Sequence, residues 1–114
     1  MENCLFCRIV NREIPSRIIY EDDMVLGFYD IEPKAPAHVL LIPKVHISSL
    51  NELTNEHSGI MAHITGVIPV VAEKLGIKDS GYRVIINCGD DSGQAVAHLH
   101  YHLLGGRLLE NNFG

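Results

Sequence analysis

The segment His98–Leu104, with the sequence HLHYHLL, restricts the fold of this chain more than any other segment. Its histidines occupy alternate positions, and a leucine or a tyrosine stands between them. Successive side chains of a β-strand point to opposite faces of the sheet. We therefore predict a strand that carries His98, His100 and His102 on one face and buries the intervening residues on the other.

Three imidazoles on one face should each have an interaction partner if that face is partly buried. An unpartnered buried ring costs about 1–3 kcal/mol, which is large beside a folding stability of about 5–15 kcal/mol. The rings could converge on zinc and leave one position open for water, or one ring could attack an electrophile held by its neighbours. A solvated sheet edge is the third interpretation. The preceding loop contains Gly89 and Gly93, which let backbone N–H groups approach an anion and favour a phosphate.

The rest of the pattern predicts an α+β domain with an antiparallel sheet. Residues 15–29 contain two β-rich pieces separated by Asp22 and Asp23, which predicts a hairpin. Apolar residues at three- and four-residue steps predict one long helix from Thr54 to Leu75. The other expected elements are a proline-broken loop over 30–38, a buried strand over 38–44, a strand over 82–87 and the strand through the histidines. This order is typical of an α+β domain, and a length of 114 residues predicts one domain over 1–114.

Charge and composition exclude several classes of partner. The formal net charge is −5, whereas nucleic-acid binding needs clustered Lys and Arg, so we expect no nucleic-acid partner. The N-terminal residues lack the apolar core of a signal peptide and no run reaches membrane-spanning length, so we expect no membrane association. Three cysteines without an export signal favour a reducing compartment, and we expect a cytoplasmic protein.

Several separated motifs resemble the histidine-triad (HIT) superfamily. HLHYHLL matches its His-φ-His-φ-His-φ-φ signature, and the GGR that follows is typical of the Hint branch. The stretches CLFCRIVNREIPS, IIYEDDMVLGFYDIEPKAPAHVLLIPKVHI and GYRVIINCGDDSGQAVAHLHYHLLGGR extend the resemblance over nearly the whole chain. It implies a HIT-like fold with an antiparallel sheet of about five strands, one main helix and a short N-terminal helix. It also implies a homodimer that hydrolyses purine nucleoside 5′-phosphoramidates, such as those of adenosine, without a catalytic cofactor.

The resemblance implies roles for four histidines. His100 matches the nucleophile that attacks the α-phosphorus and forms a covalent nucleotidyl-histidine. His102 matches the residue that contacts the phosphate or the departing amine, and His98 completes the triad. His38 matches a further histidine near the triad, for which proton relay and simple packing are both open.

The resemblance also implies a site for a purine nucleoside monophosphate. The residues implied on the phosphate and leaving-group side are Asn87, Gly93, Gln94, Ala95 and Val96. The residues implied on the ribose and base side are Asp30 and Ile31, with Phe6, Ile9, Phe28 and Ile14 around the base, although Ile14 is more simply interpreted as core. Ala95 stands where the Hint pattern commonly has Ser, so a hydroxyl near the phosphate is absent.

The spacing of Cys4 and Cys7 is that of half a zinc site, or of a redox pair. Relatives with this N-terminal pair often bind structural zinc with two further histidines, which would be His46 and His98. Two reduced thiols are the alternative. Cys88 has no partner by sequence, and we interpret His57 and His63, on the predicted helix, as solvated surface residues without a partner.

Four other functions stay open from sequence. The first is a HIT enzyme that splits dinucleoside polyphosphates, which the GGR ending disfavours. A nucleotidyltransferase of the superfamily would have Gln in place of His102. A nucleotide-binding or scaffolding module with vestigial catalysis is disfavoured by the intact triad. A zinc hydrolase would use all three triad histidines as ligands.

Overall fold

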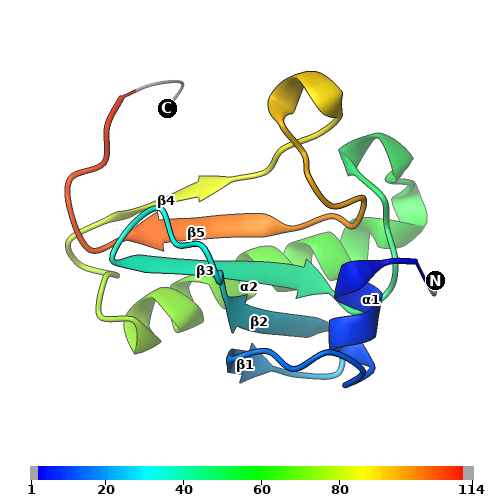
Figure 1. Ribbon diagram of the computed structural model, residues 1–114, viewed down its shortest axis with the longest axis horizontal. Coiled ribbons are helices and arrows are strands. Elements are labelled where there is room, and N and C mark those ends of the chain that lie inside the picture. Colours follow the sequence, from blue (N-terminus) through cyan, green and yellow to red (C-terminus); the bar gives the residue numbers. More distant parts are fainter. Residues whose placement is uncertain (1–2, 112–114) are drawn as a thin grey trace.

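The computed structural model describes residues 3–111, which form an open five-stranded antiparallel sheet with the order β1-β2-β3-β5-β4 (Figure 1). The strands are β1 (Ile18–Glu21), β2 (Val25–Tyr29), β3 (Ala37–Pro43), β4 (Tyr82–Ile85) and β5 (Tyr101–Gly105), and the α-helices are α1 (Leu5–Val10) and α2 (Ser58–Lys74). The α+β class, the five strands, the main helix and the short N-terminal helix are confirmed. Within residues 3–111, no helix has the length and apolar character needed to cross a membrane.

The two faces of the sheet are covered by different elements. α2 lies along one face, where it packs on residues such as Val39, Leu41 and Leu103, while α1 lies over part of the other face (Figure 1). All seven residues of β3 are buried because both of its faces are covered. The face that α2 leaves open carries the predicted histidines, since His102 pairs directly with Leu40 and both point away from α2.

Asp22 organises the turn of the predicted β1–β2 hairpin. Its Oδ1 accepts the backbone N–H groups of Met24 (2.8 Å) and Val25 (2.9 Å), which closes the turn. Its Oδ2 lies 2.7 Å from both the Tyr20 hydroxyl and Nε2 of His63 on α2. Burial raises the pKa of Asp22, but these hydrogen bonds outweigh it and hold the pKa well below its ordinary value. His63 is exposed as predicted, but the expectation that it has no partner is wrong.

The ends of the long helical segment follow its local sequence. A 3₁₀ turn, η2 (Asn55–His57), precedes α2, and the Thr54 hydroxyl accepts a hydrogen bond from the Glu56 N–H. His57 Nδ1 accepts the Thr54 N–H (3.0 Å), so His57 completes a capping box and the expectation of a free surface histidine is wrong. At the other end Gly76 has a φ of 73°, the left-handed conformation that closes many helices.

The last strand is shorter than predicted. β5 begins at Tyr101, so His98 and His100 precede it and form no part of the strand ladder. The Leu99 N–H instead donates to the carbonyl oxygen of Ile47 (2.6 Å), in the loop that follows β3. Only His102 of the three histidines lies in the strand.

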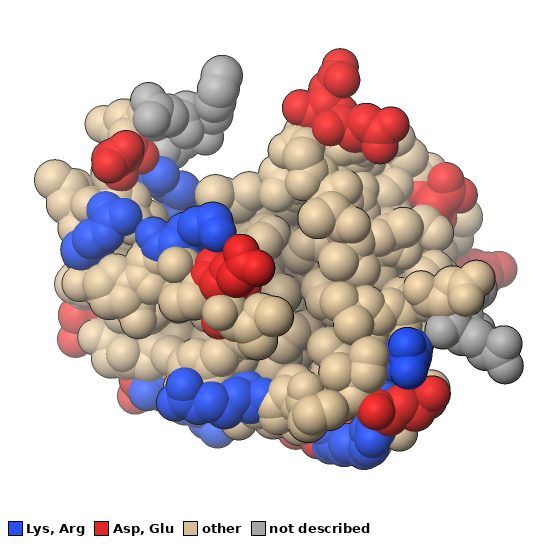
Figure 2. All heavy atoms as spheres, viewed as in Figure 1, with Lys and Arg blue, Asp and Glu red and all other residues tan. Residues whose placement is uncertain are grey.

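Charged side chains are unevenly distributed on the face that α2 leaves open. Figure 2 shows acidic side chains at the tip of η3 (Asp90–Ser92) and basic side chains gathered near the opposite end of the sheet. Mostly uncharged surface lies between the two groups (Figure 2).

Candidate active site

A cavity of about 660 Å³ opens on the face of the sheet opposite α2. Its volume lies within the range of about 300–1,000 Å³ that is usual for small-ligand sites. The predicted site residues that line it are Phe6, Ile9, Ile14, Phe28, Asp30, Ile31, His38, Asn87, Ala95, Val96, His100 and His102. Gly93, Gln94 and His98 do not line it. One cavity therefore brings together most residues of the proposed nucleotide site.

His100 presents one bare ring nitrogen to this cavity. Its side chain is only 6% exposed, and its Nδ1 lies 2.7 Å from the carbonyl oxygen of His98. A carbonyl oxygen can only accept, so the ring carries its proton on Nδ1 and Nε2 is left with a free lone pair. The edge-on ring of Phe6, with centroids 5.1 Å apart, packs against this imidazole.

His38 and His102 form a second network with the opposite tautomer. The backbone N–H of Lys34 donates to His38 Nδ1 (3.0 Å), so the proton of the neutral His38 ring lies on Nε2. His38 Nε2 lies 3.0 Å from His102 Nδ1 and 3.4 Å from Asp30 Oδ2. His102 Nδ1 accepts this hydrogen bond, which leaves the His102 proton on Nε2. His100 thus offers a lone pair at Nε2, whereas His102 carries a donor there.

Both rings of the second network are neutral in the free protein near neutral pH. Burial lowers the pKa of His102 to about 4, with a further decrease from the neighbouring His100 and His38. Burial also lowers the pKa of His38, although the Asp30 carboxylate opposes that shift. A bound anion would raise the pKa of His102, because it favours the charged ring.

The part of the cavity under α1 is apolar. Phe6 packs edge-to-face on Phe28, with ring centroids 5.5 Å apart, in a cluster that includes Ile9. Ile14 packs against the same cluster and also lines the cavity, so both of its interpretations fit its position. Ile31 is 94% exposed at the rim, where a flat ligand could cover it.

The glycine-containing loop before the histidines is braced by Gln94. Its Oε1 accepts the Gly89 N–H (2.9 Å), and its Nε2 donates to the carbonyl oxygens of Ser48 (2.9 Å) and Val96 (3.0 Å). The Gln94 side chain is therefore occupied within the protein. Gly93 has a φ of 84° at the end of η3, a conformation that favours glycine, and the chain reaches the cavity only at Ala95.

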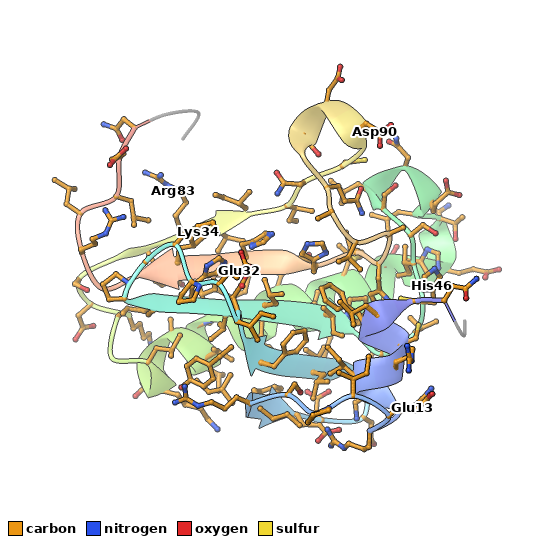
Figure 3. The ribbon with its side chains drawn as sticks, viewed as in Figure 1. Glu13, Glu32, Lys34, His46, Arg83 and Asp90 are labelled. Carbon is orange, nitrogen blue, oxygen red and sulfur yellow. The ribbon has the colours of Figure 1, made fainter. Side chains whose placement is uncertain are left out.

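The four predicted zinc ligands converge beside the cavity. The candidate ligand atoms of Cys4, Cys7, His46 and His98 all lie within 4.8 Å of one another. Figure 3 shows His46 beside α1, which supplies Cys7. The His98 ring is fully buried, and its Nε2 lies 2.8 Å from the carbonyl oxygen of Pro43, so Nε2 carries the proton and Nδ1 is free to bind a metal.

The spacing of these atoms fits a tetrahedral zinc ion. Nδ1 of His98 lies 3.3 Å from Cys4 Sγ and 3.2 Å from His46 Nδ1, and Cys7 Sγ lies 3.4 Å from His46 Nδ1. Tetrahedral zinc with its usual bond lengths separates sulfur from nitrogen by about 3.6 Å and nitrogen from nitrogen by about 3.3 Å. Without a metal, burial and the nearby Cys4 raise the pKa of Cys7 to about 11, and burial lowers the pKa of His98 to about 4. A two-cysteine, two-histidine set is therefore available to a cation that would stabilise the thiolates.

Some cavity residues were missed by sequence reasoning. They are Leu5, Pro15, Ser16, Tyr29, Glu32, Lys34, Leu40, Ile85 and Leu104. Glu32 and Lys34 lie in the predicted proline-broken loop, and Figure 3 shows both on the open face of the sheet. The alternation of the predicted strands could have indicated Leu40 and Ile85, which lie on the same face as His102.

The sheet with one long helix behind it, and a histidine-lined cavity of nucleotide size in front, defines an α+β protein with a histidine-based small-molecule site. A family model described as the HIT domain matches residues 11–109, and the chain belongs to this family. The purine nucleoside phosphoramidase of Escherichia coli strain K12 is 45% identical over 108 residues, which cover 95% of this chain and 91% of that protein.

Solved structures agree with this membership. A HIT family hydrolase from Clostridium thermocellum has a TM-score of 0.95 and 50% identity, covering 99% of this chain and 98% of that one. A histidine triad protein from Clostridium difficile has a TM-score of 0.94 and 48% identity, covering 98% of this chain and 97% of that one. The predicted resemblance and fold are confirmed, and the relatives include hydrolases of the HIT family.

Proposed function

We propose that this protein hydrolyses purine nucleoside 5′-phosphoramidates through a covalent nucleotidyl intermediate on His100. The observation that carries the proposal is the bare Nε2 of His100 in a cavity of nucleotide size, with Nδ1–H held by the His98 carbonyl. The 45% identity to a protein named purine nucleoside phosphoramidase supports the substrate class.

The cavity suggests how the nucleotide would lie. The apolar rings under α1 suit a purine base, and the Asp30 carboxylate can accept both ribose hydroxyls at the rim. The phosphate would then lie between His100 and His102, near Asn87 and the backbone of Ala95 and Val96. The base and the ribose would thereby place the phosphorus in front of the nucleophile.

In the first step His100 Nε2 attacks the α-phosphorus and the P–N bond breaks. The His102 Nε2–H donates a hydrogen bond to the departing nitrogen, which takes up a proton from solvent as the bond breaks. The amine leaves uncharged, and the nucleotide remains on the His100 ring, which still carries its proton on Nδ1. His38 Nε2–H holds His102 in the required orientation.

In the second step water attacks the same phosphorus and the bond to His100 Nε2 breaks. The attacking water releases one proton to solvent, so the products are a nucleoside monophosphate and neutral His100. His102 stays neutral in both steps and orients the reacting groups through its Nε2–H.

Zinc has a structural part in this proposal. Bound by Cys4, Cys7, His46 and His98, it would link α1 to the segment that carries the nucleophile, and no catalytic step needs it.

We also propose a cytoplasmic homodimer, since the outer strand β4 has one unpaired edge that a second copy could meet. Sedimentation of the purified protein tests the dimer.

Replacing the nucleophile tests the catalytic proposal. We expect His100→Gly to abolish hydrolysis of adenosine 5′-phosphoramidate. When the reaction of the parent protein is quenched rapidly without acid and the protein is digested, we expect a peptide that contains His100 with an added AMP group. Circular dichroism checks that the variant is folded. Equal turnover by the folded variant, or an intermediate on another residue, would contradict the mechanism.

A further inference from the structure

Three basic side chains lack the partners that the others have. Six of the nine Lys and Arg side chains contact an acidic group or an aromatic ring: Arg8, Arg12, Arg17, Lys44, Lys74 and Lys78. The other three, Lys34, Arg83 and Arg107, form no ion pair with any acidic side chain in residues 3–111. We call these three residues the cationic rim.

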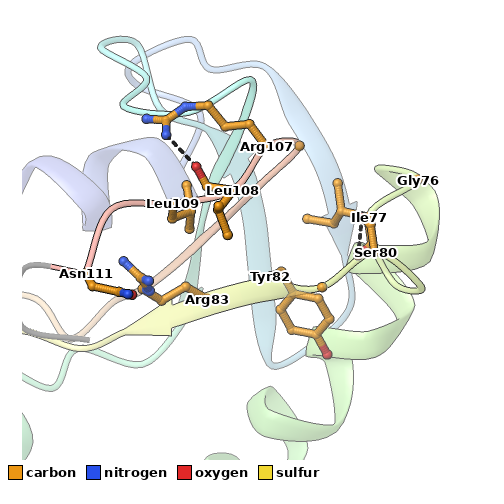
Figure 4. A pocket seen from close by; sticks show the side chains of 11 residues that line it. Gly76, Ile77, Ser80, Tyr82, Arg83, Arg107, Leu108, Leu109 and Asn111 are labelled. Atoms are coloured by element: carbon orange, nitrogen blue, oxygen red, sulfur yellow. Dashed lines mark hydrogen bonds between the residues drawn. The ribbon is translucent and has the colours of Figure 1, made fainter.

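One residue of the cationic rim lines the nucleotide cavity, and the other two lie near it. Lys34 lines the cavity itself, and Arg107 Nη2 donates to the Lys34 carbonyl oxygen (3.3 Å). Arg83 and Arg107 line a second hollow of about 530 Å³ (Figure 4). Figure 3 shows Arg83 and Lys34 on the same face of the sheet, where Figure 2 shows basic side chains gathered. The positive charges that lack a counter-charge are thus collected beside the proposed site.

The strand register places Arg83 close to His102. Ile85 pairs directly with His102, and Arg83 pairs directly with Leu104, so all four residues point to the cavity face. Arg83 is therefore the diagonal neighbour of His102, about 7–8 Å away in a sheet and within reach of a long side chain. A group that extends from the phosphorus past His102 would meet the Arg83 guanidinium.

The side chains of the cationic rim donate hydrogen bonds only to backbone carbonyl oxygens within residues 3–111. Lys34 Nζ donates to the carbonyl of Glu32 (3.2 Å), and Arg83 Nη1 donates to the carbonyl of Glu110 (2.7 Å). Each guanidinium has five N–H donors, so most remain free for a ligand. Two acids of the same loop lie in this region: Glu32, beside Lys34 (Figure 3), and Asp30, whose oxygens accept the Glu32 N–H and face His38. Neither forms an ion pair with a side chain of the cationic rim.

We propose that the cationic rim is a subsite for an anionic group on the leaving group, either a carboxylate or a second phosphate. The inference rests on the proposed function, because it takes the phosphorus to lie at His100. The lining of the same cavity includes His102, Leu104 and Lys34, and the Lys34 N–H contacts His38, which contacts His102. The subsite would select substrates whose departing amine is an amino acid, or whose departing group is a nucleotide.

The first experiment compares two matched phosphoramidates of AMP, one of glycine and one of glycinamide. They differ by one negative charge at nearly constant size. We expect kcat/KM to be about tenfold higher for glycine at low salt, and the preference to shrink as salt screens the charges. Arg83→Gln and Lys34→Gln should reduce it, whereas Lys74→Gln, on α2 behind the sheet, should preserve it.

The second experiment needs no turnover, so it tests the subsite even if the proposed function fails. Calorimetry compares binding of AMP and of ADP, whose β-phosphate lies on the leaving-group side of the α-phosphorus. Tighter binding of ADP that weakens in Arg83→Gln assigns the subsite to a phosphate, and a glycine preference in the first experiment assigns it to a carboxylate. If the triple variant Lys34→Gln/Arg83→Gln/Arg107→Gln behaves as the parent in both experiments, the proposal is overturned.

Discussion

The His98 carbonyl oxygen lies 2.7 Å from His100 Nδ1, while the His98 ring lies in the cluster with Cys4, Cys7 and His46. One residue therefore orients the proposed nucleophile with its backbone and offers a metal ligand with its side chain. Because the segment 98–100 lies outside the strand ladder, these contacts take the place of strand pairing in positioning it.

The cluster of Cys4, Cys7, His46 and His98 predicts how much zinc the protein contains. We expect the untagged protein to contain one zinc ion per chain, and Cys4→Ser to lose it. With free zinc at 100 times its Kd, the metal adds about 2.7 kcal/mol to the free energy of unfolding. Metal analysis and urea unfolding measure both effects. Cys88→Ser, outside the cluster, should keep the metal and the stability, and equal zinc in Cys4→Ser would refute the ligand set.

The hydrogen bonds predict different tautomers within the active site. Near neutral pH we expect the proton of His100 on Nδ1, and those of His38 and His102 on Nε2. Nitrogen NMR of the labelled protein distinguishes the two tautomers of each ring. His57, whose Nδ1 accepts a backbone N–H, is an internal reference for the Nε2 tautomer. A proton on His38 Nδ1 would contradict the proposed orientation of His102.

The free energy of unfolding should decrease as the pH is lowered, because of His102. Its folded pKa, about 4, lies below the ordinary value of 6.5 because the ring is partly buried. The unfolded chain then binds more protons between these values, so the stability is full above about pH 6.5 and falls as the pH decreases towards 4. Between pH 7.5 and pH 5 the parent should lose about 1 kcal/mol more than His102→Gln, since the partial exposure of the ring reduces the full effect of the shift.

Urea unfolding at the two pH values measures this difference. His38 and His98 also have lowered pKa values through burial, but they are present in both proteins, so the comparison isolates His102. The same loss of stability in parent and variant would show that His102 is not a neutral buried ring.

A glycine in β2 permits close packing with β3. A Cβ atom at Gly27 would lie 2.7 Å from Cδ2 of the fully buried Leu41. We expect Gly27→Ala to lower the free energy of unfolding by about 1–3 kcal/mol, since a packed core resists added volume. Gly66→Ala in α2, where a Cβ meets nothing within 4 Å, should raise it by about 0.5–1 kcal/mol. Denaturant unfolding of both variants checks the contrast.

Much of the fold follows from local patterns. The hairpin around Asp22, the main helix that ends before Gly76 and the buried strand that ends at Pro43 all lie close to their predicted positions. These features depend on side-chain periodicity, capping and turn chemistry, which act over a few residues. The predicted start of the last strand was wrong, and the contacts of His98 and Leu99, with Cys4 and Ile47, come from residues far along the chain that local patterns do not show.

The sequence by itself indicated the residues of the proposed sites: the three alternate histidines, the cysteine pair and the loop acid Asp30. Only the tertiary structure decided how they are arranged. The tautomers of His38 and His102 depend on the Lys34 N–H, and the alignment of Arg83 beside Leu104 depends on strand register. Hydrogen-bond direction and cross-strand distance are properties of groups brought together by folding, so a linear pattern of residue types does not contain them.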